Sequence, residues 1–359
     1  MKINTLKMFG CAALSLCFAL VSQAQSVSST PVGYVTYTVN ANSDLKLGIP
    51  MEQASSFTGS VSSVSAGVVD AGSAVGDLTT DAHFLKVTSG TLAGNWYEVT
   101  AASGNTITVA DDLAAAGLAA DDTFQVTPFW TLNTLFPSGG NVPQTSNIFG
   151  AAEALVLTFD PNASGTNLSA AFAYAYDSSG TMTGGVPGWV NVNTFAGSDS
   201  QVINPDLHLL IRNNTANSFD VVIAGTVPSA STSLNIVSTS NSGQDNLVYN
   251  PFPADITLGT SNLYESGAVA AAPNIFDVST ADIVLVYDLD TNGQNPSTSA
   301  AYVYDSVGTM TGGVAGWINV NTFAAADNAV IKAGQSIIIR KAQGSDADVS
   351  WTVGLPYSL

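Results

Sequence analysis

The residues best suited to chemistry in this sequence form an acidic loop after a strand-like apolar run. Asp288-Leu-Asp290-Thr-Asn292-Gly293 has the spacing D-x-D-x-N-G of the start of a calcium-binding loop. Alternate oxygen side chains in this pattern converge on the ion, and the glycine permits a sharp turn. Position 12 of such a loop is Ser299, not a bidentate glutamate. Because Asp, Asn and Gly also form hairpin turns, a calcium site and a solvated turn both stay open.

A weaker copy of this loop lies 128 residues earlier, at Asp160-Pro-Asn162-Ala-Ser164-Gly165. It offers the side-chain oxygens of Asp160, Asn162 and Ser164 at the same spacing, and its position 12 is Ala171. Calcium is thus the only cofactor that the sequence suggests, and a solvated turn is the simpler interpretation of both loops.

A second candidate site is a platform for carbohydrate. Tryptophan faces stack on sugar rings, and neighbouring asparagines hydrogen-bond to hydroxyl groups. Period-two alternation predicts strands over 171–176 and 189–195, which places the aromatic and asparagine side chains on strand faces. The candidate residues are Tyr174, Tyr176, Trp189, Asn191 and Asn193, with Tyr302, Tyr304, Trp317, Asn319 and Asn321 in the second copy. The alternative is that these aromatic residues fill a core.

Catalysis has weaker support than either binding site. His83 and His208 stand alone, and the sequence contains no H-E-x-x-H or G-x-S-x-G motif. A glycosidase needs only two carboxylates, and Asp177 and Asp305, at the ends of equivalent predicted strands, are the most noticeable. Turn capping is the simpler role for both.

An internal repeat determines the predicted architecture. Residues 176–195 match 304–323 at 17 of 20 places. Further upstream, Ser43–Met51 resembles Gln244–Phe252 at an offset of 201, which predicts about 73 inserted residues in the first copy. The predicted domains are 31–52 plus 129–228, an insert at 53–128, and 229–359.

Short alternating runs separated by Gly, Asn and Asp turns predict an all-β protein. We expect two tandem duplicated antiparallel β-sandwich-like domains, with a small β-barrel-like insert in the first. The mature chain is long enough for two or three cores.

The first residues have the pattern of a secretory signal peptide. Lys2 and Lys7 precede an apolar run from Met8 to Val21, and small residues precede a cleavage position after Ala24. Residues 1–24 contain both cysteines. Their removal takes the formal net charge from −19 to −21, which makes nucleic acid a poor partner because affinity for it comes from Lys and Arg. No later run approaches the roughly 20 apolar residues of a membrane helix.

The layout resembles an uncharacterised family of secreted bacterial proteins that occur as sets of paralogues. The segments that carry the resemblance are the signal peptide, residues 33–50 and 89–99, the two GW-containing strand pairs and residues 331–341. This resemblance implies a related fold and no activity.

We therefore expect a non-catalytic secreted or outer-surface protein with a structural, adhesive or envelope role, with polysaccharide or cell-surface proteins as partners. The alternatives are a carbohydrate-binding module protein, with or without calcium, and a carboxylate-based glycan-active enzyme.

Overall fold

The structure is a computed structural model that describes residues 30–78, 80–240, 242–344 and 348–358. The predicted signal peptide, residues 1–24, lies outside these described residues. From Pro31 onward they belong to one compact unit, so the predicted domain boundaries stay a prediction. Nearly all regular structure is β-strand, and every strand pair is antiparallel. The all-β prediction is confirmed.

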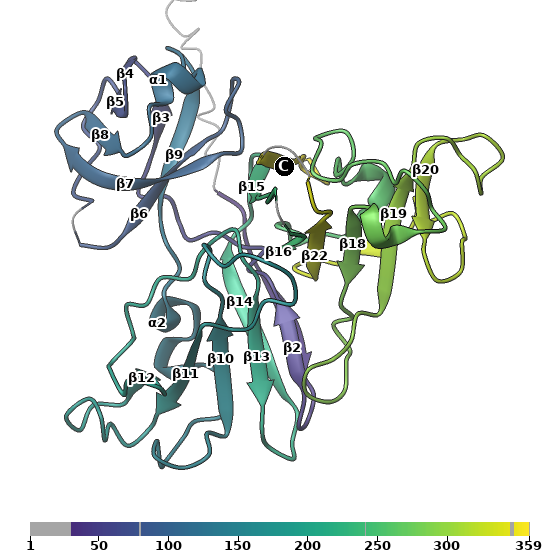
Figure 1. Cartoon of the computed structure of the whole chain (residues 1–359). Coiled ribbons are helices and arrows are strands. Elements are labelled where there is room, and N and C mark those ends of the chain that lie inside the picture. The colour runs from purple at the N-terminus through teal and green to yellow at the C-terminus, as the bar shows by residue number, and fades with distance from the viewer. Residues whose placement is uncertain (1–29, 79, 241, 345–347, 359) are drawn as a thin grey trace, which may run out of the picture. The chain divides into compact units, whose positions relative to one another are not determined.

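Two five-stranded sheets have the same strand order. The first runs β12 (Gly188–Asn191), β11 (Phe172–Asp177), β10 (Ala154–Thr158), β13 (Leu209–Asn213) and β2 (Asp44–Leu47). The second runs β20 (Gly316–Asn319), β19 (Ala300–Asp305), β18 (Ile283–Val286), β22 (Ser336–Lys341) and β16 (Gln244–Tyr249). Figure 1 shows the purple strand β2 beside the teal strand β13, which comes much later in the chain. We call these sheets, with their paired strands and loops, repeat 1 and repeat 2.

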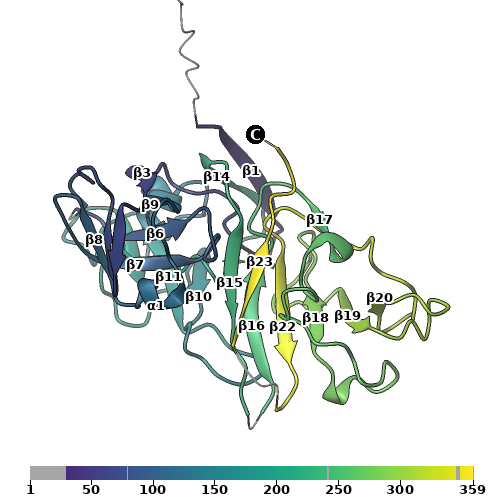
Figure 2. The same cartoon turned by 90° about the horizontal axis from the view of Figure 1, so that it is seen from above.

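Each five-stranded sheet buries one face against a two-stranded sheet. In repeat 1 the two-stranded sheet consists of β1 (Val32–Val39) and β14 (Phe219–Thr226). In repeat 2 it consists of β15 (Thr232–Ile236) and β23 (Val349–Val353). Figure 2 shows β15 and β23 side by side. Alternation places Val221 and Ile223 of β14 in one core with Leu45, Val156 and Trp189. The equivalent core of repeat 2 contains Trp351 and Val353 with Val248, Val284 and Trp317. This arrangement is sandwich-like.

Residues 57–128 form a seven-stranded sheet with its own core, seen curled in Figure 1. Its order is β3 (Phe57–Ser60), β9 (Thr123–Pro128), β6 (His83–Val87), β7 (Trp96–Ser103), β8 (Thr106–Val109), β5 (Val68–Asp70) and β4 (Ser63–Ser65). Its end strands β3 and β4 each pair with only one neighbour among the described residues. The insert is therefore a curled, half-barrel-like sheet that is open between β3 and β4.

The remaining elements are short. They are β17 (Ile256–Thr257) paired with β21 (Val330–Ile331), the α-helices α1 (Leu113–Ala116) and α2 (Leu132–Leu135), and the 3₁₀ turns η1 (Pro137–Gly139), η2 (Leu258–Thr260) and η3 (Val278–Thr280). Within the described ranges, no helix has the length and apolar character needed to cross a membrane.

Candidate functional site

The acidic loop that follows β18 in repeat 2 lies against the start of β2 in repeat 1. The N–H of Asp44 donates to the carbonyl oxygen of Gly293 (3.1 Å), and the N–H of Asn295 donates to Asp44 Oδ2 (2.7 Å). The Gly293 N–H also donates to Ser43 Oγ (2.8 Å). Arg212, opposite Asp44 in the β13–β2 pair, donates two hydrogen bonds of 2.8 Å to the Asp44 carboxylate and one of 3.0 Å to Asn295 Oδ1. The loop thus completes the hydrogen bonding of a buried carboxylate in the other repeat.

The same contacts occur in the opposite direction, from the loop after β10 in repeat 1 to the start of β16 in repeat 2. The N–H of Asn167 donates to Asp245 Oδ2 (2.7 Å), and the N–H of Asp245 donates to the carbonyl oxygen of Gly165 (2.9 Å). Arg340 donates to both Asp245 oxygens (2.6 and 2.8 Å) and to Asn167 Oδ1 (3.0 Å). We call Asp44, Arg212 and Asn295 the first clamp, and Asp245, Arg340 and Asn167 the second clamp.

Burial makes both clamps necessary. The side chains of Asp44 and Asp245 have no exposed surface, while those of Arg212 and Arg340 keep 23% and 30% exposed. An ionised carboxylate out of water is costly unless it is paired and hydrogen-bonded. The hydrogen bond to its aspartate raises the pKa of each arginine, so both arginines stay charged.

Asparagine suits the remaining place in each clamp because of its backbone conformation. Asn167 and Asn295 have φ of +57° and +52°. Asparagine enters this left-handed region more readily than other residues with a side chain, and its amide oxygen also accepts from the arginine.

The predicted calcium ligands occupy these two loops but face solvent or a lysine. Asp288 and Asp290 are 49% and 83% exposed, and Lys332 Nζ lies 3.8 Å and 3.6 Å from their carboxylates. Asn292 is exposed. No group of three or more His, Cys, Asp or Glu side chains suited to a metal ion occurs in the part of the chain that the structure describes.

In repeat 1 the corresponding loop forms a local turn. Asp160 Oδ1 accepts a hydrogen bond from the Asn162 N–H (2.9 Å), and Asn162 and Ser164 are exposed. What both loops share is their contact with the other repeat, through Gly165 and Gly293 and the asparagine two residues later.

We predict that Asn295→Ala lowers the free energy of unfolding by about 1–2 kcal/mol, since it removes a hydrogen bond to Arg212 and strains the left-handed backbone. The matched control is Asn292→Ala, three residues earlier, which removes a predicted calcium ligand and should leave stability within about 0.5 kcal/mol of wild type. Urea denaturation with and without 5 mM calcium is the measurement. A wild-type gain in calcium that Asn292→Ala abolishes would instead assign the loop to the ion.

The tryptophans predicted to bind carbohydrate lie in the cores. Trp189 has no exposed surface and Trp317 has 2%. The indole N–H of Trp189 donates to the carbonyl oxygen of Phe136 (3.3 Å), and its ring packs edge-on against Tyr176 (5.7 Å between centroids). Trp317 packs in the same way against Tyr304 (5.5 Å). Neither indole presents a face to a sugar ring, so the core alternative describes both.

The asparagines that follow these tryptophans cap turns, and the strand predicted over 189–195 ends early for this reason. β12 stops at Asn191, whose Oδ1 accepts from the N–H groups of Asn193 (2.9 Å) and Thr194 (3.1 Å). Phe195 then adopts φ of +59°. The second copy repeats this turn, with Asn319 Oδ1 accepting from the N–H groups of Asn321 (2.9 Å) and Thr322 (3.2 Å). Asn193 and Asn321 are exposed at the turn.

The two noticeable carboxylates cap the hairpin loops after β11 and β19. Asp177 is fully buried and accepts from the Ser179 hydroxyl and from the N–H groups of Ser179, Gly180 and Met182. Burial raises the pKa of Asp177, but these hydrogen bonds outweigh burial and hold the pKa below its ordinary value. Asp305 accepts from three backbone N–H groups in the same way. Such carboxylates are committed to the fold and are poor general acids.

The two histidines are also structural. His83 bonds Ser56 Oγ (3.0 Å) and the carbonyl oxygen of Asp81 (2.7 Å). His208 lies where the repeats meet, and its Nδ1 is 2.6 Å from the hydroxyl of Ser336, the residue 128 positions later. Burial, and then the positive charge of Lys46, lower the pKa of His208 to about 3.

The low pKa of His208 predicts acid lability. Its ordinary pKa is about 6.5, so between pH 6.5 and 3 the unfolded chain takes up a proton that the folded chain does not, and stability falls as pH falls. Asp206, whose pKa is raised to about 6 by burial, acts in the opposite direction between about pH 4 and 6, because the folded chain then holds the extra proton.

A comparison of wild type with His208→Gln separates the effect of His208 on stability from that of Asp206. From pH 7 to pH 4 we expect wild type to lose roughly 2–3 kcal/mol more folding free energy than the variant does. Guanidinium denaturation at both pH values is the measurement. Equal losses in the two proteins would show that His208 does not titrate abnormally.

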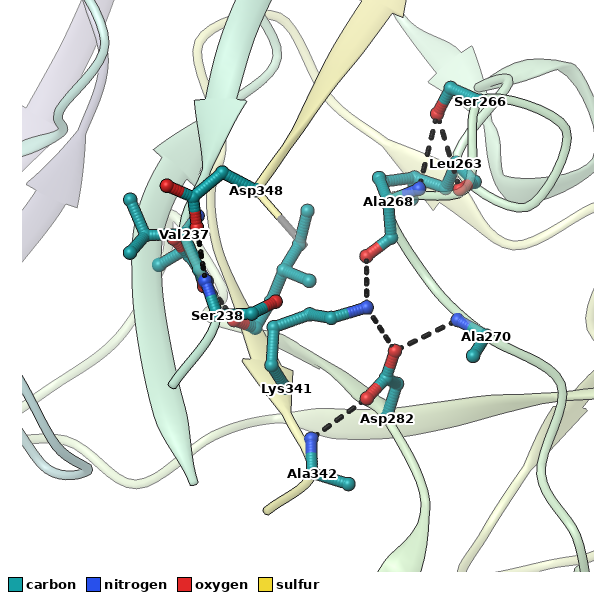
Figure 3. Close-up of polar contacts among 12 residues, drawn as sticks. Val237, Ser238, Leu263, Ser266, Ala268, Ala270, Asp282, Lys341, Ala342 and Asp348 are labelled. Carbon is teal, nitrogen blue, oxygen red and sulfur yellow. Dashed lines mark hydrogen bonds and ion pairs between the residues drawn. The ribbon is translucent and has the colours of Figure 1, made fainter. Parts of the chain in front are cut away.

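Repeat 2 contains a buried ion pair that repeat 1 lacks. Lys341 and Asp282 are 4% and 1% exposed, and their side chains are in direct contact (Figure 3). Lys341 Nζ also donates to the carbonyl oxygen of Ala268, while Asp282 accepts from the N–H groups of Ala270 (2.8 Å) and Ala342 (2.7 Å). Its many partners make this pair a structural connection between β18, β22 and the loop before β18.

Removing one partner should therefore be costly. We predict that Asp282→Ala lowers the free energy of unfolding by about 3–5 kcal/mol, because it leaves the Lys341 ammonium buried without its counter-charge. Asp288→Ala, at an exposed acid six residues later, is the control and should change it by less than about 1 kcal/mol. Thermal unfolding of both variants is the measurement, and similar losses in the two would contradict this role.

Comparison with known proteins adds no relative. This chain matches no known protein family, no curated protein and no solved structure.

Proposed function

We propose that the protein is a non-catalytic structural component outside the cytoplasm, which assembles with copies of itself through equivalent apolar patches, one on each repeat. The location rests on the sequence of residues 1–24. The main support for the assembly is the pair of exposed patches described next.

Each patch contains two phenylalanines whose rings pack at a tilt, at the sheet end that bears β12 or β20. In repeat 1, Phe149 is 65% exposed and packs on Phe195 with 5.3 Å between ring centroids. In repeat 2, Phe276 is 63% exposed and packs on Phe323 at 5.5 Å. Exposed apolar groups that recur in this way mark interaction sites. We call these the first and second phenylalanine patches.

The loops that carry Phe195 and Phe323 are uncharged, whereas Asp277 directly follows Phe276 in the second patch. Residues 178–198 and 306–326 contain no Asp, Glu, Lys or Arg, although the whole chain has a net charge of −19. Val186 and Val314, in the same two stretches, are 65% and 68% exposed. Two copies of an acidic protein repel each other through most of their surfaces, and this repulsion is smallest where the uncharged stretches meet.

A second copy is the partner that this surface fits. Phe195 and Phe323 lie in stretches that are identical at 17 of 20 places, and each packs on an exposed phenylalanine, so the two patches present the same pair of aromatic residues. A patch that pairs with itself gives a two-fold contact. Two such patches on one chain allow each copy to hold two others, and this extends the assembly into filaments.

The other candidate functions have less support. The indoles that would stack on a sugar are buried, and Asp177 and Asp305 are fully engaged in turn capping. The buried tryptophans and the two capping aspartates thus maintain the fold, whereas Phe149 and Phe276 are largely exposed to solvent.

The test is sedimentation velocity of the mature chain at increasing concentration. Wild type should form species larger than dimers. Phe149→Ser with Phe276→Ser should remain monomeric, and Phe149→Ser alone should stop at dimers, because one patch is left. Wild type that stays monomeric at millimolar concentration, or a double variant that still assembles, would refute the proposal.

The control for these variants is Tyr34→Ser, which removes an equally exposed aromatic residue (72%) on β1, away from both patches. It should assemble as wild type does. The melting temperature of each variant shows whether the fold is kept, which we expect because both phenylalanines are largely in solvent.

A further inference from the structure

A cavity of about 490 Å³ lies between the two repeats, next to both clamps. Its apolar wall contains Leu157 and Leu210 of repeat 1 with Leu247 and Ile338 of repeat 2. Cavities of 300–1,000 Å³ are the size that holds small-molecule ligands. The proposed assembly through the phenylalanine patches does not use this cavity.

The cavity contains one cation that lies outside the ion pairs. Lys46 of β2 extends into it, with Nζ 3.5 Å from the centroid of the Tyr287 ring. The arginines of the clamps are neutralised by Asp44 and Asp245. In the described ranges of the chain, no carboxylate forms an ion pair with Lys46. The charges around the cavity therefore sum to about +1, inside a protein of net charge −19.

In repeat 2 the equivalent place is apolar. The residue at the equivalent place in β16, 201 positions later, is Leu247, which is buried in the same inter-repeat cluster. A leucine there packs without cost, whereas a half-buried ammonium loses hydration. The Tyr287 ring offsets part of this cost, and an anion that enters the cavity would offset the rest.

Polar groups lie at the exposed rim. Asn167, Ser169 and Asn295 line the cavity and are in contact with solvent. Deeper in, the neutral imidazole of His208 keeps its Nε2 without a hydrogen-bond partner among the described residues. Amide, hydroxyl and imidazole groups are suited to the hydroxyls of a ligand.

From this combination we infer a binding site for a small hydroxylated monocarboxylate of the size of a hexuronic acid, with its carboxylate on Lys46 and its hydroxyls toward the rim. The single unpaired cation sets the charge of the ligand. The rim groups set its hydroxyl content, and the leucines and isoleucine accept its apolar face.

The site should weaken at alkaline pH. Burial, partly offset by the charges of Asp44 and Asp245, lowers the pKa of Lys46 to about 8. The other charged or titratable groups around it are Arg212, His208 and Tyr287. His208 is already neutral, both clamp arginines stay charged, and burial raises the pKa of Tyr287. Between pH 7 and 9.5 the change in affinity thus follows Lys46.

The experiment is calorimetric titration of the full mature chain with sodium glucuronate, and with glucose as the uncharged ligand of the same shape. We expect glucuronate to bind at least tenfold more tightly than glucose at pH 6.5, and to lose that advantage at pH 9.5. Lys46→Met should remove at least tenfold of the glucuronate affinity. Its melting temperature should equal or exceed that of wild type, because Leu247 shows that an apolar residue fits.

The control is Lys332→Met, which removes an exposed lysine beside Asp288 and Asp290 and should leave glucuronate binding unchanged. Benzoate, a carboxylate without hydroxyls, should bind more weakly than glucuronate. The inference is overturned if glucuronate binds no better than glucose or benzoate, or if Lys46→Met binds as wild type does. Assembly measured by sedimentation is a separate readout, so failure of one proposal leaves the other standing.

Discussion

The buried carboxylates of Asp44 and Asp245 are the constraint on which this structure depends. Each is out of water, and each is satisfied only by an arginine of its own repeat and a loop of the other. Neither repeat can complete the hydrogen bonding of its own aspartate. The free-energy cost of leaving a buried carboxylate incomplete therefore couples the two repeats, in agreement with the single compact unit that the described residues form. The loops take their conformations from this contact, which is why Asn167 and Asn295 share a left-handed backbone.

The duplicated sheets also differ where they meet. At three equivalent positions near the centre, Gly48 faces Tyr249, Lys46 corresponds to Leu247, and His208 bonds Ser336. A Cβ on Gly48 would lie 1.8 Å from the Tyr249 ring. Two tyrosines could not occupy that space, and two glycines would leave a void, so divergence at the centre follows from packing. The cavity beside Lys46 lies in this asymmetric region, whereas the clamps at its margins have kept their symmetry.

Sequence patterns predicted the all-β class because alternation and turn residues are local signals. They were less informative for the acidic loops, since calcium ligands and docking turns use the same residue types. The deciding partners of Asn295 are Asp44 and Arg212, which are far away in the chain. One signal was available: the asparagine two residues after the loop glycine recurs in both copies, as do the aspartate and arginine that it meets.

The prediction of which side chains share a strand face was wrong for a more specific reason. Strict alternation over 189–195 placed Trp189 and Asn193 on one face, but the Asn191 side chain ends the strand by capping a turn. Side-chain capping competes with the sheet ladder and is invisible to a period-two pattern. Tryptophan followed by asparagine thus suggested a binding face where the fold has a core residue followed by a turn.

The near identity of 176–195 and 304–323 is mostly explained by this turn and its surroundings. Asp177 must cap, and Gly180 has no room for a Cβ, which would lie 2.5 Å from the Val186 nitrogen. Trp189 must fill the core, and Asn191 must end the strand. These demands do not extend to Val186, which has the same exposed counterpart, Val314, in repeat 2. Packing inside the chain does not explain this exposed match between the copies, and the proposed contact between two molecules would explain it.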